Sequence, residues 1–294
     1  MKMTGAEFMD WPNKAITLMG MSGVGKTTLA NNWPKSRWFH YSGDYRIGTK
    51  YLAEPILDNI KRQAMKVDFL RDLLRSDSIY IASNITVHNL APVATFLGKI
   101  GRSDLDGLSV DAFKERQRLH RLAEIGAMRD VKEFIKKAKQ LYGYDNFLND
   151  SGGSICELND PKTLEILSEN TLILYLQAEP VMEEKIIQRA IDNPKPMYYQ
   201  EEFLDFQLNE YLKEIGLNDV DEIIPDEFVR WIFPKHVENR RSKYQAIADE
   251  YGYTVDASLA ENVTNEAQFL DCLLYTSDAA DDSLRVDLGG RRII

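Results

Sequence analysis

The sequence contains few cysteines and no long apolar run. Two cysteines, Cys156 and Cys272, are too few for a disulfide framework, and their scarcity favours a reducing, cytoplasmic location. No apolar stretch approaches the roughly 20 residues that cross a bilayer. The first 13 residues lack the apolar core of a signal peptide. We therefore expect a cytoplasmic protein with no membrane partner.

Basic residues are also in the minority, since the formal net charge is −10. A protein whose main partner is nucleic acid needs a basic surface, so we expect no nucleic-acid partner. The four histidines show no metal-ligand spacing. At 294 residues, 44% of them hydrophobic, the chain can bury a sizeable core. Composition leaves the oligomeric state open.

The most specific pattern in the chain is Gly20 to Thr27 (GMSGVGKT), which fits G-x-x-x-x-G-K-[ST]. The apolar run Ala15 to Met19 reads as a buried strand before it, and Thr28 to Trp33 can continue as a helix until Pro34. A strand, a glycine-rich loop and a helix in this order predict a phosphate-binding loop, or P-loop. The predicted nucleotide-binding residues are Gly20, Ser22, Gly23, Val24, Gly25, Lys26, Thr27 and Thr28.

The chemistry of such a loop is specific. Its backbone N–H groups and the helix dipole point at one concave spot and attract phosphate. Lys26 is expected to reach the β- and γ-phosphates, and the Thr27 hydroxyl is the expected Mg²⁺ ligand. The sequence therefore predicts ATP and Mg²⁺ as cofactors.

Apolar strand patterns alternate with helical periodicity along the chain. Strands are predicted at 37–42, 147–150, 171–176 and 253–256. Helical periodicity covers 50–74, 111–141 with a break near Gly126, and 226–251 with an interruption at Pro234; 79–85 is ambiguous and 193–196 is a loop. This alternation predicts an α/β fold, the three-layer P-loop NTPase fold, with a parallel sheet. Ligands of such sheets bind beyond the carboxyl ends of the strands, which singles out Asp44 and Arg46.

The class of P-loop protein is narrowed by what the chain does not contain. A GTPase would need N-K-x-D late in the chain, and the single Asn-Lys pair precedes the P-loop. A remodelling ATPase would show an apolar strand that ends in Asp-Glu, whereas the strongest strand pattern ends in Gln177-Ala-Glu-Pro180. These absences favour a small-molecule kinase.

Five segments in order resemble the shikimate-kinase-like branch of P-loop kinases. After the P-loop, Phe39 to Ile47 resembles the F-x-D-T-D-x-x-I segment, and Ser151 to Ser154 resembles the Gly-Gly-Gly turn. Gln188-Arg189 with Lys195-Pro196 is similar to the lid, and Arg240 to Ala248 resembles the R-x-P-x-Y-x-x-x-A helix.

The resemblance implies roles for individual residues. Asp44 would bind the acceptor hydroxyl and serve as base, and Arg189 would contact the transferring phosphate. The predicted catalytic residues are thus Lys26, Asp44 and Arg189. The predicted substrate-binding residues are Asp44, Arg46, Gly152, Gly153 and Arg240, with Arg240 holding a substrate carboxylate.

The chain also departs from that family. Ser42 replaces an Asp that normally supports Mg²⁺ through water, and the family's Phe-Arg pair has no clear counterpart, Phe113 to Arg116 being the nearest. The chain is longer than a typical member, with the surplus at 48–144 and 199–234. We expect one domain over 1–271, with a helical insertion at about 48–144 and a lid region at about 186–234. These departures favour an acceptor other than shikimate.

The last segment, 272–294, resembles the conceptual translation of sequencing-adapter DNA. Its composition changes abruptly from a helical pattern to a short incoherent tail. We therefore expect a non-native tail and a native chain that is cut off near Asp271.

The sequence thus predicts an ATP-dependent phosphotransferase that acts on a small hydroxylated, anionic metabolite. The alternative is an ATP-binding regulatory or partner-remodelling ATPase, which the replacement at Ser42 keeps open. A polynucleotide 5′-kinase is disfavoured by the acidic charge.

Overall fold

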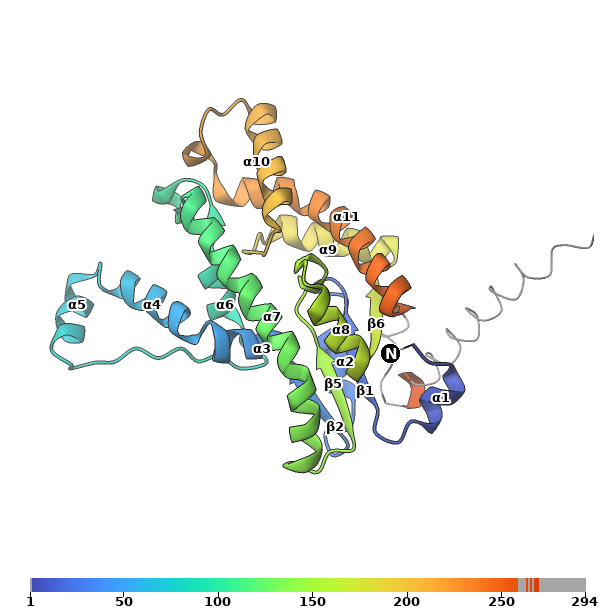
Figure 1. Cartoon of the computed structure of the whole chain (residues 1–294). Helices are drawn as coiled ribbons and strands as arrows, with labels where there is room; N and C mark the ends of the chain where they lie inside the picture. Colours follow the sequence, from blue (N-terminus) through green and yellow to red (C-terminus); the bar gives the residue numbers. More distant parts are fainter. Residues whose placement is uncertain (1, 259–262, 264, 266, 270–294) are drawn as a thin grey trace, which may run out of the picture.

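The computed structural model describes residues 2–258, 263, 265 and 267–269. The predicted tail at 272–294 lies outside the described residues. A five-stranded parallel sheet forms the centre of the molecule (Figure 1), in the order β2-β5-β1-β6-β7. Its strands are β1 (Ala15–Met19), β2 (Trp38–Ser42), β5 (Asn146–Asp150), β6 (Leu172–Gln177) and β7 (Gly252–Asp256).

Helices cover both faces of this sheet. Every residue of β1 and β5 is buried, and because alternate side chains point to opposite faces, both faces must be covered. The predicted α/β class with a parallel sheet is therefore confirmed. The helices are α1 (Gly5–Asp10), α2 (Lys26–Asn32), α3 (Gly43–Arg46), α4 (Ala53–Ala64), α5 (Asp68–Arg75), α6 (Ala91–Leu97), α7 (Val110–Gln140), α8 (Pro161–Asn170), α9 (Pro180–Asp192), α10 (Glu201–Ile215) and α11 (Pro225–Tyr251).

Shorter elements connect these helices. A π-helical turn, η1 (Ile47–Tyr51), and three 3₁₀ turns, η2 (Ser103–Leu105), η3 (Ile155–Glu157) and η4 (Val220–Glu222), lie between them, and β3 (Lys99–Ile100) pairs with β4 (Gly107–Leu108). Residues 79–85 belong to no helix or strand, and the predicted loop at 193–196 is confirmed. Among the described helices, none is long and apolar enough to cross a membrane.

Three predictions about the helices are wrong: one predicted helix is split, and two predicted breaks do not occur. The region 50–74 is split into η1, α4 and α5. The predicted break at Gly126 does not occur; instead, a Cβ there would lie 2.6 Å from the Tyr51 ring, so the glycine permits close packing. Likewise, α11 continues through Pro234, because Phe233 and Val237 on either side of it are buried in the core.

The sheet topology determines which loops meet. Strand β5 lies between β1 and β2, and Asp150 is in register with Leu18 on one side and Ser42 on the other. The end of β5 therefore lies between the P-loop, which follows β1, and Asp44, which follows β2. In Figure 1, α4 and α5 project away from the sheet, whereas α10 and the first turns of α11 form a separate helical end.

Candidate active site

The P-loop joins β1 to α2 through three glycines with positive φ. Gly20, Gly23 and Gly25 have φ angles of 147°, 96° and 94°, which residues with a side chain rarely adopt. A Cβ on Gly20 would also lie 2.7 Å from the Leu176 carbonyl oxygen of the neighbouring strand β6. The backbone thus requires glycine where the motif has it. Of the other predicted loop residues, Val24 is buried, and Ser22 and Thr28 are exposed.

Lys26 and Thr27 are the first residues of α2, and hydrogen bonds hold both side chains. Lys26 is buried, and its Nζ donates to the carbonyl oxygens of Gly20 at 2.7 Å and Met21 at 3.1 Å. Burial lowers the pKa of Lys26, and the carboxylates of Asp150 and Asp44 oppose that shift. The ammonium is therefore positioned where phosphate oxygens would replace backbone carbonyls as its partners.

Asp150, which the sequence analysis did not select, completes this part of the site. The Thr27 hydroxyl donates to Oδ2 of Asp150 at 2.6 Å, across 123 residues of sequence. Asp150 is buried at the carboxyl end of β5, and His40 Nε2 lies 3.6 Å from the same oxygen. A P-loop hydroxyl beside a strand-terminal aspartate is the pair that holds Mg²⁺ in P-loop NTPases, so these residues fit that ion. In the sequence, Asp150 is indicated only by its position at the end of the strand Asn146–Asp150. No glutamate follows it, so the strand does not match the Asp-Glu ending of a remodelling ATPase.

Asp44 follows β2 in the first turn of α3 and is half-buried. Its carboxylate forms no hydrogen bond with any described residue. Burial and the nearby Asp150 raise the pKa of Asp44 to about 6, and Lys26 opposes that shift. Ser42 caps α3 by accepting a hydrogen bond from Tyr45 N. Asp44 is thus an available carboxylate whose pKa suits a general base near neutral pH.

One cavity of about 480 Å³ brings together six of the predicted site residues: Ser22, Gly23, Asp44, Gly153, Arg189 and Arg240. The P-loop, α3, the glycine turn, α6, α9, the loop after α9 and α11 all contribute to it. Its lining residues are Ser22, Gly23, Asp44, Leu90, Val93, Ala94, Leu97, His120, Gly153, Ser154, Ile186, Arg189, Ala190, Asn193, Lys195, Pro196, Met197, Tyr198, Phe233 and Arg240.

Arg189 of α9 lies directly over the P-loop. A Cβ on Gly23 would collide with Nη2 of Arg189, so the guanidinium occupies the space that this glycine leaves open. Arg189 is exposed and, like Lys195 after it, forms no ion pair with a described residue. Both cations are therefore available to anionic ligands of the cavity.

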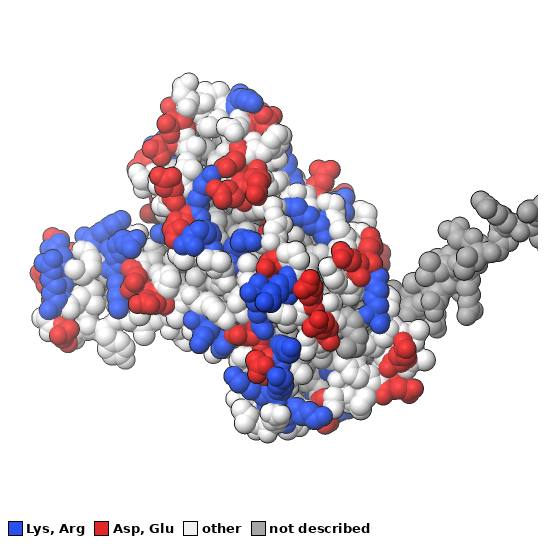
Figure 2. Space-filling view, viewed as in Figure 1, with Lys and Arg blue, Asp and Glu red and all other residues white. Residues whose placement is uncertain are grey.

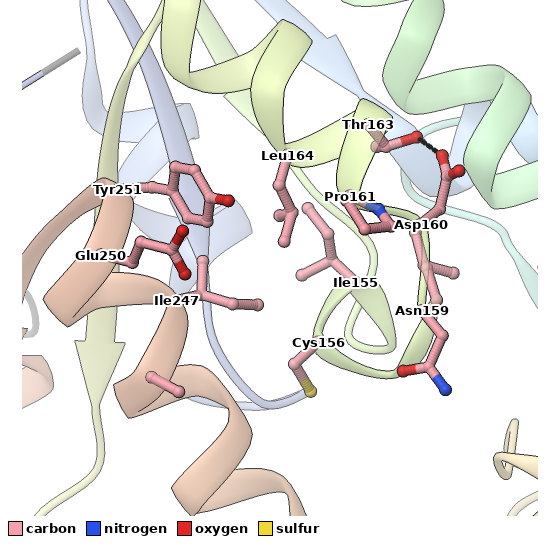
Figure 3. A pocket seen from close by; sticks show the side chains of 12 residues that line it. Ile155, Cys156, Asn159, Asp160, Pro161, Thr163, Leu164, Ile247, Glu250 and Tyr251 are labelled. Carbon is pink, nitrogen blue, oxygen red and sulfur yellow. Dashed lines mark hydrogen bonds between the residues drawn. The ribbon is translucent and has the colours of Figure 1, made fainter.

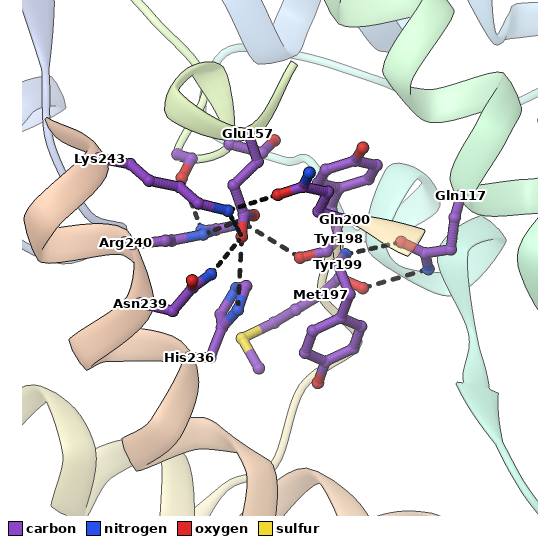
Figure 4. A network of polar contacts seen from close by, with 12 residues as sticks. Gln117, Glu157, Met197, Tyr198, Tyr199, Gln200, His236, Asn239, Arg240 and Lys243 are labelled. Carbon is purple, nitrogen blue, oxygen red and sulfur yellow. Dashed lines mark hydrogen bonds and ion pairs between the residues drawn. The ribbon is translucent and has the colours of Figure 1, made fainter. Parts of the chain in front are cut away.

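Arg240 also lines the cavity, but its donors are already used (Figure 4). Nε donates to Glu157 Oε2 at 2.9 Å, Nη1 to the Gly153 carbonyl at 2.6 Å, and Nη2 to the Tyr198 carbonyl at 3.0 Å. The predicted carboxylate anchor is thus engaged in joining α11 to the glycine turn and to the segment after α9.

Arg46 is not brought to the cavity. Its Nε and Nη2 donate to Asp130 Oδ2 at 2.8 and 2.7 Å, and its guanidinium lies 4.8 Å from the centre of the Phe134 ring. Arg46 therefore ties α3 to α7, and its predicted substrate contact has no counterpart in this arrangement.

A second buried carboxylate, that of Glu124 on α7, lies beside the glycine turn and is not among the predicted site residues. A Cβ on Gly152 would lie 2.5 Å from Glu124 Oε1 and 3.0 Å from Asp44 Oδ1, so both acids approach one backbone position. Glu124 of α7 is fully buried and accepts a hydrogen bond from the Ser154 hydroxyl. Burial raises its pKa to about 7, with Asp44 adding to the shift. No local pattern distinguishes this glutamate from the others of α7.

A second hollow, of about 270 Å³, lies between α8 and α11 (Figure 3). Burial raises the pKa of its single thiol, Cys156, to about 12, so the thiol is neutral at physiological pH. Asp160 at its rim is bound by Arg129 at 2.8 Å. Neither this thiol nor the Asp160 carboxylate is therefore an available catalytic group, and no cluster of three or more metal-ligating side chains occurs in the described part of the chain.

No protein-family model and no curated protein sequence matches this chain. Among solved structures, it is similar to a crystal structure at 1.7 Å resolution titled as shikimate kinase from Bacteroides thetaiotaomicron. That match has 13% sequence identity and a TM-score of 0.39, and it covers 94% of this chain and 98% of the other. A similarity of this size says nothing about the reaction of this chain.

Proposed function

We propose that the chain is an ATP- and Mg²⁺-dependent phosphotransferase that phosphorylates a hydroxyl group of a small, anionic metabolite. The proposal rests on one observation: Ser22 and Gly23 of the P-loop, the available carboxylate of Asp44 and the available cation of Arg189 line the same cavity. Such an arrangement can place an acceptor hydroxyl beside the terminal phosphate of a bound nucleotide.

In the proposed reaction, the acceptor oxygen attacks the γ-phosphorus of ATP. A new P–O bond forms, the bond to the β,γ-bridging oxygen breaks, and ADP leaves. Asp44 takes the proton of the acceptor hydroxyl, while Lys26 and Arg189 stabilise charge on the phosphoryl oxygens. Thr27 and Asp150 would hold Mg²⁺, which neutralises phosphate charge when bound.

Arg240 acts in this proposal as a positioning residue. Its bonds to Gly153 and Tyr198 hold the glycine turn and the segment after α9 in place, and Lys195 remains available for the anionic part of the acceptor. The negative charge of the acceptor would thus be bound by Arg189 and Lys195, which form no ion pair with a described residue, and not by the buried Arg240.

The Asp44→Asn variant tests the base assignment. We expect phosphoryl transfer from γ-labelled ATP to a panel of hydroxylated organic acids to fall by roughly 10²–10⁴-fold, because the amide cannot take a proton. Nucleotide affinity, measured by fluorescence of a labelled ATP analogue, should stay within a few-fold of the parent. Asp145→Asn, an exposed aspartate next to β5, is the matched control and should be fully active. Transfer at the parent rate in Asp44→Asn would refute the assignment.

The alternative, a regulatory ATPase, is favoured by one feature. Helix α5 has no buried residue, and Phe69 on it is 71% exposed. A projecting helix with exposed apolar side chains among charged ones suits a protein partner more than it suits a metabolite kinase. ATP turnover that responds to no small acceptor, yet rises with a protein fraction, would favour this second function.

A further inference from the structure

The cavity that receives the proposed acceptor is strongly asymmetric in its chemistry. Its polar groups come from the P-loop, α3, α7, the glycine turn, α9, the loop after α9 and Arg240 of α11. By contrast, α6 contributes only apolar side chains to the lining: Leu90, the residue before the helix, with Val93, Ala94 and Leu97. Phe233 of α11 and Ile186 of α9 add to this apolar lining.

The apolar lining is held firmly by the structure. Val93 and Leu97 are 7% and 5% exposed, and Phe96 between them packs into the core. Arg116 of α7 donates to the Phe96 carbonyl at 2.7 Å, which secures the end of α6. The apolar lining is thus formed by buried, well-packed residues of the helix α6.

Polar groups that need a partner lie in the same cavity. His120 lines it, stacks on Tyr198 with ring centres 5.5 Å apart, and is 94% buried, and its Nδ1 has no hydrogen-bond partner among the described residues. The half-buried Asp44 carboxylate also forms no hydrogen bond with a described residue. Buried polar groups without partners are costly, so a ligand that supplies hydrogen-bonding groups at this position would be favoured.

We propose that the acceptor is amphipathic: an alcohol whose hydroxyl lies beside Asp44 and whose apolar body packs against α6 and Phe233. A polyhydroxylated metabolite would leave its hydroxyls unpaired against Val93, Ala94 and Leu97, at a high cost in binding. An alkyl or aryl body would instead bury apolar surface of the acceptor and of the cavity lining, which favours binding. This inference rests on the proposed phosphotransferase function and specifies its substrate class.

The first experiment compares two acceptor series with γ-labelled ATP. One series consists of hydroxy acids with alkyl chains of increasing length, and the other of polyhydroxy acids of equal chain length. We expect kcat/KM to rise by about fourfold per added methylene in the first series, until the cavity is full. The polyhydroxy acids should be at least tenfold poorer. Equal or better transfer to the polyhydroxy series overturns the inference, whereas no transfer to either series, with ATP only hydrolysed, overturns the proposed function itself.

The second experiment alters the apolar lining. Ala94→Asn places an amide on the cavity side of α6, and Thr95→Asn places the same group one residue later, where Thr95 is exposed and outside the cavity. We expect Ala94→Asn to lower kcat/KM for alkyl hydroxy acids by roughly tenfold or more, with the KM for ATP unchanged. Thr95→Asn should match the parent. Equal values for the two variants, or an equal loss toward both acceptor series, would contradict the apolar contact.

Discussion

Glu124 places a carboxyl group where the protein excludes water. It is fully buried, its Oε1 has no hydrogen-bond partner in the described part of the chain, and His120 Nδ1 lies 3.9 Å from its Oε2. Asp44, Glu157 and Arg240 are the charged groups that influence it. Burial raises its pKa to about 7 from an ordinary value of 4.5, so the folded protein retains a proton that the unfolded chain has already released.

This shift predicts that stability depends on pH through Glu124. A raised carboxyl pKa contributes stability that is fully present below about pH 4.5 and is lost as pH rises through about 7. Between pH 5 and 8, urea unfolding of the parent should lose up to about 3 kcal/mol from this group. Glu124→Gln cannot ionise and should lose correspondingly less. The exposed Glu115→Gln on the same helix should follow the parent, and an identical pH response in Glu124→Gln would disprove the assignment.

At this scale, the sequence could predict residues that belong to one local motif. Lys26, Thr27 and the P-loop glycines are adjacent in sequence, and the motif requires each of them. Asp150 and Glu124 could not be chosen in this way, because their importance comes from contacts made across the fold to Thr27 and Ser154. They are two of 46 acidic residues, and local sequence does not reveal which of these the sheet brings to the cavity.

At the scale of elements, Glu157 joins three segments. It lies in η3, fully buried, and pairs with Arg240 of α11, while Asn239 donates to its Oε1 at 3.2 Å. Through Arg240 it also supports Tyr198, and Gln117 of α7 holds the next residue by accepting from Tyr199 N at 2.9 Å. Figure 4 shows these groups converging from α7, α11 and the segment after α9.

We therefore expect Glu157→Gln to be strongly destabilising. Arg240 would remain buried without a countercharge, which costs about 3–5 kcal/mol in the free energy of unfolding. A double variant that adds Arg240→Met should recover part of this loss, since it removes the unpaired charge. Glu183→Gln breaks the exposed pair with Arg241, the next residue of α11, and should cost about 1 kcal/mol or less. Equal losses in Glu157→Gln and Glu183→Gln, measured by urea unfolding, would show that the buried pair has no special role.

The sheet could be predicted well from sequence, and the helices less well, for a physical reason. Strands β1 and β6 are continuous apolar runs, because both faces of the sheet are covered. The breaks expected at Gly126 and Pro234 follow local propensity, but packing against Tyr51 and burial of Phe233 outweigh it. Local propensity therefore located the elements, and tertiary contacts decided their lengths.

At the scale of the whole molecule, two apolar cores are linked by the long helices α7 and α11. The larger core surrounds the sheet, and the smaller one joins α10, the start of α7 and the first turns of α11. Helix α11 contributes Phe228 and Ile232 to the smaller core, and Val237 and Tyr244 to the larger one. On the face in Figure 2, positive and negative side chains are interspersed, so no separate charged surface divides these parts.

A continuous helix through both cores predicts that they unfold together. Phe228 is 1% exposed, and Phe228→Ala should lower the free energy of unfolding by about 3–5 kcal/mol. In a Trp231→Phe background, which removes the tryptophan of the smaller core, the remaining tryptophans report on the sheet core by fluorescence: Trp33 and Trp38 are buried in it, and Trp11 packs against it. They should show the same lowered urea midpoint as far-UV circular dichroism.

The matched control is Phe206→Ala on α10, since Phe206 is 62% exposed. Its stability should stay within about 0.5 kcal/mol of the parent. Cooperative unfolding would mean that the smaller core, although remote from the P-loop, helps to hold Arg240 and hence the glycine turn in place. A sheet-core midpoint that does not move in Phe228→Ala would instead show that only the first turns of α11 unfold, and that the sheet core alone supports the cavity beside the P-loop.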